Sequence, residues 1–152
     1  MKKKILIISG GISKERTISL DTGKQVAKEL KKNGYRVKLC EPNYELINKA
    51  KIFKPQVIFN ALHGQFGEDG YIQSILEKIG IPYTHSGIIS SAMAMDKEIS
   101  KKIFLKNKIL TPKYFIYSFD KPKKKLINTI QKKLHFPVVI KPINEGSSVN
   151  VF

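Results

Sequence analysis

The sequence has a single cysteine, no tryptophan and no long apolar run. With Cys40 alone, an internal disulfide is excluded, and a reducing compartment, the cytoplasm, is expected. No apolar stretch approaches the ~20 residues that a membrane-spanning helix requires. The apolar stretch after the basic start covers only residues 5–8, too short for a signal peptide. We therefore expect a first β-strand there and no association with a membrane.

A shortage of acidic residues gives the chain a strongly positive charge. The sequence has 28 lysine and arginine residues against 12 aspartate and glutamate residues, a formal net charge of +16. The basic residues are spread along the chain and cluster tightly only at residues 121–125, KPKKK. No aromatic-interleaved basic motif and no zinc-finger spacing accompany them, and charge alone is weak support for nucleic-acid binding. We interpret the charge as a solvated lysine surface and keep a nucleic-acid-associated protein as an alternative.

The first half of the sequence alternates apolar runs with amphipathic stretches. The apolar runs predict four strands, over residues 4–9, 36–40, 56–62 and 81–84. The amphipathic stretches predict helices over residues 17–33, 44–53 and 71–79. Gly34 and Gly80 are placed to end the first and third of these helices. The alternating order predicts an α/β fold in which helices cover both faces of a Rossmann-like parallel sheet.

The second half has a different pattern. Met95, Ile99 and Ile103 predict one face of a helix that runs to about residue 106, and a second helix is expected around Ile130. Strands are predicted over residues 113–119, 137–140 and 149–152. Small and polar residues at 86–95 suit a linker or a helix entry. We therefore predict two domains, residues 1–90 and residues 91–152.

The first candidate site is GGISKERTIS, residues 10–19. Two glycines after a strand let the backbone turn tightly and approach a ligand. The third glycine of G-x-G-x-x-G is missing, and Glu15 lies where it would repel a pyrophosphate. A carboxylate at this position suits a substrate ammonium group. Glu15 could equally be a helix-capping acid stabilised by the helix dipole, and the spacing leaves both interpretations open.

The second candidate site is FNALHGQFGEDG, residues 59–70. It follows a predicted strand at the edge where open α/β sheets bind ligands. His63 lies in a glycine-rich loop and could donate to a carboxylate or move a proton, so we favour a functional role for it. Asp69 is interpreted as an N-cap of the helix that starts at Tyr71.

The third candidate site is VVIKPINEGSSVNVF, at the end of the sequence. It lacks the G-x-x-x-x-G-K-[ST] pattern of a Walker A loop, and no helix follows. Two predicted strands around a Gly-Ser-Ser turn predict a β-hairpin flap instead. Its backbone N–H groups and hydroxyls could cover phosphate oxygens, and Lys141 adds positive charge. An ordinary surface hairpin is the alternative.

Together, four stretches closely resemble the D-alanine–D-alanine ligases of the ATP-grasp superfamily. They occur in the order and spacing of that family, from about residue 4 to residue 149, and read GGISKERTIS, ALHGQFGEDGYIQSILEKIGIPYT, SGIISSAMAMDK and FPVVIKPINEGSSV. The resemblance implies a substrate-binding Rossmann-like domain over residues 1–90. It also implies the first α+β lobe of an ATP-grasp domain over residues 91–152.

The resemblance implies roles for individual residues around the amino acid. Glu15 resembles the acid that holds the ammonium group of the first D-alanine, and His63 resembles the histidine beside its carboxylate. Glu68 resembles an acid that helps to anchor a mobile active-site loop. Ser147 resembles the serine whose hydroxyl links Glu15 to that loop, so Glu15 and Ser147 are the implied catalytic residues.

The resemblance also implies a nucleotide site. Lys97 and Lys141 resemble the two lysines that bind the phosphates of ATP. The flap over these phosphates is implied to be Glu145, Gly146, Ser147, Ser148 and Val149. The family uses ATP and Mg²⁺ to activate one D-alanine as an acyl phosphate, and the amine of a second D-alanine then forms the dipeptide for peptidoglycan. The sequence holds no candidate metal cluster, so the metal ligands are expected in the part of the family that follows the matched region.

Three departures from the family qualify these expectations. Asn150 and His85 each replace a usual glycine, and the chain ends at Phe152, where the family continues. We therefore expect the N-terminal portion of a ligase that is inactive alone and whose full-length form is a homodimer. A truncated gene, a frameshift and one half of a split enzyme with a separate C-terminal partner all remain open. A non-catalytic remnant and a ligase with another second substrate, such as D-lactate, are further alternatives.

Overall fold

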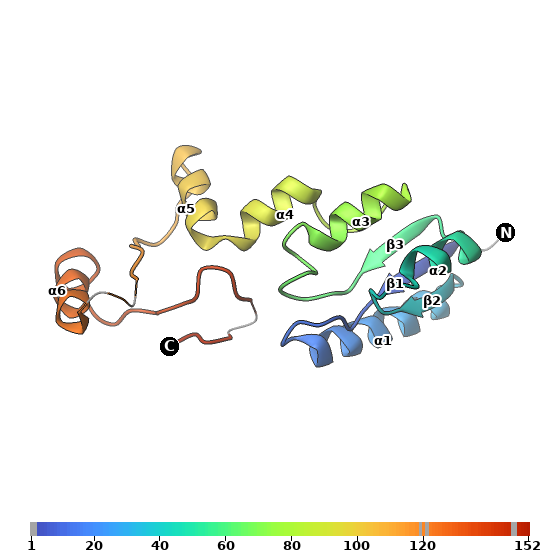
Figure 1. The fold of residues 1–152 in the computed structure, drawn as a ribbon, viewed down its shortest axis with the longest axis horizontal. Coiled ribbons are helices and arrows are strands. Elements are labelled where there is room, and N and C mark those ends of the chain that lie inside the picture. The colour runs from blue at the N-terminus through green and yellow to red at the C-terminus, as the bar shows by residue number, and fades with distance from the viewer. Residues whose placement is uncertain (1–2, 119, 121, 147–148) are drawn as a thin grey trace.

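A computed structural model describes residues 3–118, 120, 122–146 and 149–152. The ribbon is elongated, with a sheet and its helices at one end and the last helix at the other (Figure 1). A long connection without regular structure, residues 107–118, joins helix α5 (Lys97–Lys106) to the far end of the molecule. The chain then returns toward the sheet, so that its last residues lie between the two ends (Figure 1).

Three parallel strands form the sheet in the order β2-β1-β3. They are β1 (Lys4–Ile8), β2 (Arg36–Cys40) and β3 (Val57–Asn60), and Ile5 pairs with both Val37 and Val57. The predicted parallel α/β fold is therefore confirmed. The predicted fourth strand is shorter than expected: it consists of one parallel bridge between Ile58 and Tyr83.

Helices cover both faces of this sheet. Helix α1 (Arg16–Lys32) packs on one face, where Ile7 and Ala27 are buried together. Helices α2 (Leu46–Phe53) and α3 (Tyr71–Ile79) pack on the other face, and Figure 1 shows α1 and α3 on opposite sides of the strands. The buried core on this second face comprises Leu6, Ile8, Cys40, Leu46, Ala50, Ile58, Leu62, Ile72 and Leu76. The predicted apolar positions therefore form two core layers.

Helix α1 approaches strand β1 unusually closely at Gly23. A Cβ added to Gly23 would lie 2.6 Å from the Cβ of Ser9, closer than real side chains come. Ser9 follows β1 directly and is buried. The absence of a side chain at Gly23 therefore sets how near α1 lies to the sheet.

Most of the stretch predicted as a linker or a helix entry, residues 86–95, forms a helix of its own. Helix α4 (Ile88–Met95) is separated from α5 by Asp96, whose backbone is extended. The Asp96 Oδ1 atom accepts a hydrogen bond of 2.9 Å from the backbone N–H of Ile99, so Asp96 caps α5. The single helix expected to carry both Met95 and Ile103 is wrong, because this cap starts a new helix after Met95.

Beyond α5, helix α6 (Lys123–Lys133) is confirmed, whereas the predicted strands are not. Residues 113–118, 137–140 and 149–152 carry no assigned strand, and residue 119 lies outside the described residues. Ile140 and Phe152 exchange both backbone hydrogen bonds, of 2.7 and 2.9 Å, as a single antiparallel pair does. The expected hairpin is therefore reduced to one pair, and within the described part of the chain no strand lies beside residues 113–118 to form a ladder.

The second half of the chain buries few apolar side chains. Ile99 is 39% exposed, whereas Ile130 is buried. None of the helices in the described part of the chain is both long and apolar enough to cross a membrane.

Candidate functional site

The loop after β1 is held by a buried serine on helix α1. Gly10 and Gly11 have positive φ angles of 90° and 82°, as the predicted tight turn requires. The N–H of Gly10 donates to Ser19 Oγ at 2.8 Å, and Ser19 Oγ donates to the carbonyl oxygen of Ala61 at 2.7 Å. Ser19 is fully buried and so joins α1 to the loops that follow β1 and β3. This role of Ser19 is not visible in the sequence, since serine is common on solvated helix faces.

Glu15 is buried at the start of α1. It occupies the N-cap position, but its side chain makes no capping hydrogen bond. A Cβ on Gly64 would overlap Oε2 of Glu15, and a Cβ on Gly146 would lie 3.2 Å from the same atom. The carboxylate therefore lies between the backbones of two loops, at a helix N-terminus whose dipole favours negative charge.

The charge of Glu15 has no protein partner in the part of the chain that the structure describes. Glu15 is 5% exposed, and the ion pairs among the described residues join other side chains. Burying a carboxylate without a cation or hydrogen-bond donors is strongly unfavourable. The position therefore suits a small cationic group that brings its own charge.

His63 is held near Glu15 from two sides. Its carbonyl oxygen accepts a 2.9 Å hydrogen bond from Ser13 Oγ, and its ring Nε2 lies 3.0 Å from Thr22 Oγ1 on α1. The His63 ring is half-buried, so one side remains open to solvent or ligand. The structure therefore brings the loop after β3 to the same end of α1 as Glu15.

The two acids that follow His63 fold the glycine-rich loop. Glu68 Oε2 accepts a 2.7 Å hydrogen bond from the N–H of Gly64, the residue that abuts Glu15. Asp69 accepts hydrogen bonds from the N–H groups of Phe66 and Tyr71, at 2.7 and 3.0 Å. The prediction that Asp69 is the N-cap is wrong by one residue, because Gly70 is the N-cap and Asp69, just before it, accepts from the first N–H of α3.

Asn60 is a second residue whose role the sequence did not indicate. Its Nδ2 donates to the carbonyl oxygen of Gly67 at 2.9 Å and lies 3.1 Å from Nδ1 of His85. Its Oδ1 accepts from the N–H of Leu62 at 3.1 Å. His85 has a φ of 85°, a conformation that favours glycine and accounts for the usual glycine there.

On the nucleotide side, Lys97 holds the segment that leads into the predicted flap. Its Nζ donates to the carbonyl oxygens of Ile143, at 3.2 Å, and Glu145. Burial lowers the pKa of Lys97, and the nearby positive charge of Lys141 lowers it further. The two predicted phosphate-binding lysines therefore lie close enough to repel each other, and an anion between them would relieve this repulsion.

The predicted flap begins beside Glu15. Lys14 Nζ and Glu145 Oε1 form an ion pair of 3.1 Å, and Gly146 abuts the Glu15 carboxylate. Val149 donates its N–H to the carbonyl oxygen of Gly146 at 2.9 Å. Ser147 and Ser148, both predicted as site residues, lie outside the described residues. Asn150 adopts a φ of 53°, which explains a usual glycine and which asparagine tolerates.

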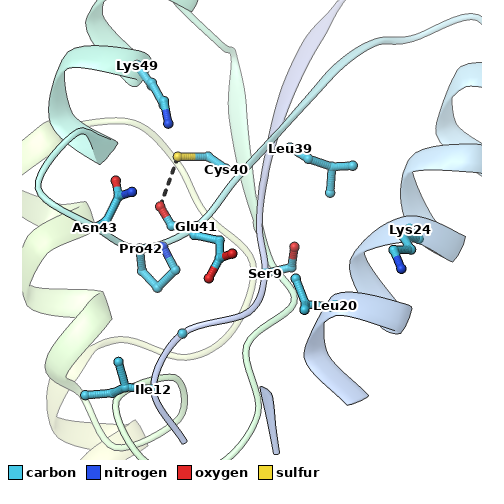
Figure 2. A pocket seen from close by; sticks show the side chains of 11 residues that line it. Ser9, Ile12, Leu20, Lys24, Leu39, Cys40, Glu41, Pro42, Asn43 and Lys49 are labelled. Carbon is cyan, nitrogen blue, oxygen red and sulfur yellow. Dashed lines mark hydrogen bonds between the residues drawn. The ribbon is translucent and has the colours of Figure 1, made fainter. Parts of the chain in front are cut away.

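Two cavities lie beside the glycine turn. The larger, about 560 Å³, lies at the carboxyl ends of β1 and β2. Figure 2 shows its lining, which comprises Ser9, Gly11, Ile12, Leu20, Lys24, Leu39, Cys40, Glu41, Pro42, Asn43 and Lys49. Cys40 Sγ donates to the carbonyl oxygen of Glu41 at 3.1 Å, and burial raises the pKa of this thiol. The smaller cavity, about 160 Å³, is lined in part by His63, whereas none of the predicted site residues lines the larger one.

The residues present suit an anionic nucleotide better than a metal ion. The positive charges of Lys97 and Lys141 influence each other, and phosphates are the ligands predicted for them. Among the described residues, no three His, Cys, Asp or Glu side chains are grouped so that they could hold a metal. Magnesium requires a set of oxygen ligands, so this part of the chain does not fit it as a metal site.

Comparison with known proteins places these features in a family context. Residues 40–86 match the family described as D-ala D-ala ligase N-terminus. The chain is 70% identical to the D-alanine--D-alanine ligase of Pelagibacter ubique, over 100% of this chain and 50% of the relative. It is 42% identical to the ligase of Moorella thermoacetica, over 98% of this chain and 49% of that relative. The chain therefore spans about half the length of the curated relatives it matches.

Solved structures give the same result. The crystal structure of D-alanine--D-alanine ligase from Bacillus anthracis matches with a TM-score of 0.78 and 37% identity, over 99% of this chain and 48% of that one. A structure of the same Bacillus enzyme complexed with ATP matches with a TM-score of 0.72 and 37% identity, over 98% and 50%. The overall fold is therefore shared with about half of each of these chains.

Proposed function

We propose that this chain, which is related over nearly its whole length to D-alanine–D-alanine ligases, binds the first D-alanine and the phosphates of ATP in such a ligase. The relatives are about twice as long as the region that matches. The proposal therefore assigns substrate binding to this chain and formation of the dipeptide to an enzyme that also contains the other half. On this basis the 152-residue chain alone forms no D-alanyl-D-alanine.

The observation that carries the proposal is the buried carboxylate of Glu15. It has no charged partner among the described residues. It lies between two loops, at Gly64 and Gly146, where there is little or no space for a larger side chain. An amino-acid ammonium group is small and brings three hydrogen-bond donors with its positive charge. It would satisfy Glu15 as a charge-assisted hydrogen bond does elsewhere.

The rest of the amino acid would face His63. The Thr22 hydroxyl lies 3.0 Å from Nε2 of this ring and fixes its orientation. The half-buried histidine can donate to a carboxylate beside an ammonium group that contacts Glu15. Glu68 would contribute indirectly, because it holds Gly64 against Glu15. Its family role in anchoring a mobile loop remains part of the proposal.

ATP phosphates would contact Lys97, Lys141 and the backbone that begins at Glu145. Lys97 reaches this backbone through the carbonyl of Glu145, so the lysine and the flap form one unit. The same proposal places Gly146 and Val149 over the phosphates, and extends the contact to Ser147 and Ser148 from the sequence alone.

The reaction would then proceed by transfer of the γ-phosphoryl group to a carboxylate oxygen of the bound D-alanine. ADP leaves, and the product is an acyl phosphate. The amine of a second D-alanine attacks the acyl carbon, a C–N bond forms, and inorganic phosphate leaves as the C–O bond breaks. The residues of this chain contribute by positioning the amino acid and by placing positive charge beside the phosphates. No step is assigned to a metal ligand, because no three His, Cys, Asp or Glu side chains of the described residues are grouped to hold a metal.

The test compares D-alanine with D-lactate, which carries a hydroxyl in place of the ammonium group. Isothermal calorimetry on the 152-residue chain should detect D-alanine and find D-lactate much weaker. Glu15→Gln keeps the shape and removes the charge, so it should weaken D-alanine about tenfold to somewhat over a hundredfold, as expected for a charged hydrogen bond of roughly 1.5–3 kcal/mol. Glu29→Gln, on an exposed part of the same helix, is the matched control and should change nothing.

Nucleotide binding provides the reciprocal measurement. Lys141→Ala should weaken ATP while leaving D-alanine affinity nearly unchanged, whereas Glu15→Gln should do the opposite. If D-lactate and D-alanine bound equally, or if Glu15→Gln were silent, Glu15 would be a helix-capping acid and the ammonium assignment would fall.

A further inference from the structure

We propose that Lys14 and Glu145 form a clasp that holds residues 143–146 over the Glu15 carboxylate, which makes Lys14 a positioning residue for both substrates. The proposal rests on the function proposed above for Glu15 and for the flap. It assigns a role to Lys14, which lies within the GGISKERTIS stretch but receives no role from the sequence.

The clasp joins two segments that are 131 residues apart. Lys14 Nζ lies 3.1 Å from Glu145 Oε1. The residue after Lys14 and the residue after Glu145 also lie against each other. Lys14 precedes Glu15, whose carboxylate contacts Gly146, and Gly146 follows Glu145. One ion pair therefore fastens the two backbones at the place where they meet.

Lys97 fastens the same segment from the opposite side. Its Nζ donates to the carbonyl oxygens of Ile143 and Glu145, and its backbone N–H donates to Ile143 at 3.1 Å. Glu145 is therefore held by its main chain toward the nucleotide side and by its side chain toward the amino-acid side. A ligand that moves Lys97 would act on Glu145, and through Lys14 on the loop that carries Glu15.

The charges around the clasp leave Glu145 as the partner of Lys14. Arg16, the next basic residue, pairs with Glu41 at 2.7 Å. Glu15 lies beside Lys14 in sequence, but its carboxylate is turned toward Gly64 and Gly146. The Lys14 side chain is 65% exposed and that of Glu145 34% exposed, so water screens the pair. Exposed pairs of this kind shift an equilibrium by up to about fivefold.

Carboxyl labelling of the 152-residue chain tests the clasp without any ligand. A water-soluble carbodiimide with glycinamide converts accessible carboxylates to amides, and peptide mass spectrometry reports the labelling of Glu15. Lys14→Gln and Glu145→Gln should each raise Glu15 labelling about two- to fivefold. Lys24→Gln is the matched control, because its partner Asp21 lies on its own helix, and it should leave Glu15 labelling unchanged. The two test variants change the local charge in opposite directions, so a shared increase is not an effect of charge on the reagent.

The charge-swapped variant, Lys14→Glu with Glu145→Lys, completes the test. It should return Glu15 labelling to within about twofold of the unmodified chain. Unchanged labelling in the single variants, or a swap that labels as strongly as they do, would overturn the clasp.

Calorimetry with D-alanine separates this proposal from the one on which it rests. If the clasp holds, the single variants should weaken D-alanine two- to fivefold and the swap should restore it. If Lys14→Gln and Glu145→Gln raise Glu15 labelling but the chain does not bind D-alanine, the proposed substrate is wrong and the clasp still stands. If the chain binds D-alanine but Lys14→Gln leaves Glu15 labelling unchanged, the clasp is wrong and the proposed substrate still stands.

Discussion

Residues 4–84 and residues 97–152 differ in how they use apolar side chains. Among the described residues, twelve of the thirteen buried apolar residues lie in the first region, and the other is Ile130. The second region instead exposes large side chains such as Leu110, at 99%, and Phe152, at 82%. Similar apolar runs thus lead to a core in one region and to an open surface in the other.

The difference shows that a strand depends on its neighbour. Residues 57–60 form β3 because β1 lies beside them and pairs along the whole stretch. Residues 113–118 are as rich in aromatic and β-branched side chains but have no strand beside them. Since backbone groups in a strand need partners outside it, the second run stays irregular.

Truncating one leucine in each region should give the largest contrast. Leu76 is fully buried on α3, so Leu76→Ala should lower the free energy of unfolding by about 2–5 kcal/mol. Leu110→Ala removes a side chain that is 99% exposed and should change it by less than about 0.5 kcal/mol. Urea denaturation followed by circular dichroism measures both. Equal losses would show that Leu110 is buried in solution, for example against another copy.

Hydrogen exchange should separate the regions next most strongly. Amides in β1 and β3 are bonded within a covered sheet, whereas the Ile140–Phe152 pair has no further ladder. We expect exchange at Ile140 and Phe152 to be at least about tenfold faster than at Ile7 and Ile58, since local opening needs little exposure of apolar surface. Two-dimensional NMR after transfer to D₂O measures this. Uniform protection would contradict the contrast between the two regions.

Two glycine substitutions within the first region should separate the cost of backbone strain from the cost of a steric clash with Glu15. Gly64 and Gly80 both have positive φ, 67° and 74°, so alanine is strained at each. The space at Gly80 is open, whereas at Gly64 a methyl group meets Glu15. Gly80→Ala should cost about 1 kcal/mol, and Gly64→Ala should cost about 1–3 kcal/mol more and abolish D-alanine binding. Equal thermal melting and equal D-alanine binding would mean that Glu15 moves away freely.

The smallest expected effect is a pH dependence that starts from Lys97. Its pKa is lowered by burial and then by Lys141, so the folded state binds this proton less tightly than the unfolded state. Stability from this group should therefore rise as the pH increases toward 10.5, its ordinary pKa. Lys97→Met should remove this slope, while the loss of the hydrogen bonds from Lys97 to Ile143 and Glu145 lowers the melting temperature at every pH.

Lys102 provides the control of opposite sign. The hydrogen bond from Lys102 to Glu98 raises its pKa, so its contribution is present below 10.5 and is lost at higher pH. Lys102→Met should therefore lower the melting temperature at pH 7, if it changes it at all. Identical pH profiles for the two variants would show that the burial of Lys97 has no influence on its proton.

The sequence predicted the elements whose signals are local. Helix α3 followed from its apolar spacing and Gly80, and strand β2 was placed at residues 36–40 as observed. The predictions of strands after residue 112 were wrong, because the composition of a segment does not show whether another strand lies beside it to form hydrogen bonds. The break at Asp96 was missed because the apolar spacing continues across it, while the cap depends on one side chain.

The candidate site divides in the same way. The contact of Asp69 with the start of α3 could be predicted to within one residue, because it follows from a position next to a helix. Ser19, Asn60 and Lys14 were missed, since Ala61, Gly67 and Glu145, with which they pair, lie 42, 7 and 131 residues away and ordinary surface positions carry the same residue types. Distant pairing of this kind is not visible in residue spacing.

The close approach at Gly23 makes the proposed amino-acid site sensitive to a position remote from it. Helix α1 is a rigid rod with Glu15 at its start, and Gly23 lies about 12 Å further along its axis. A side chain at this contact point would push against Ser9 and tilt the rod, and Glu15 would swing as the end of a lever. A change at Gly23 would thus alter the distance between Glu15 and Gly64, although Gly23 itself is not assigned to any ligand. Variation at Gly23 would change which amino acids fit without altering any residue that contacts them.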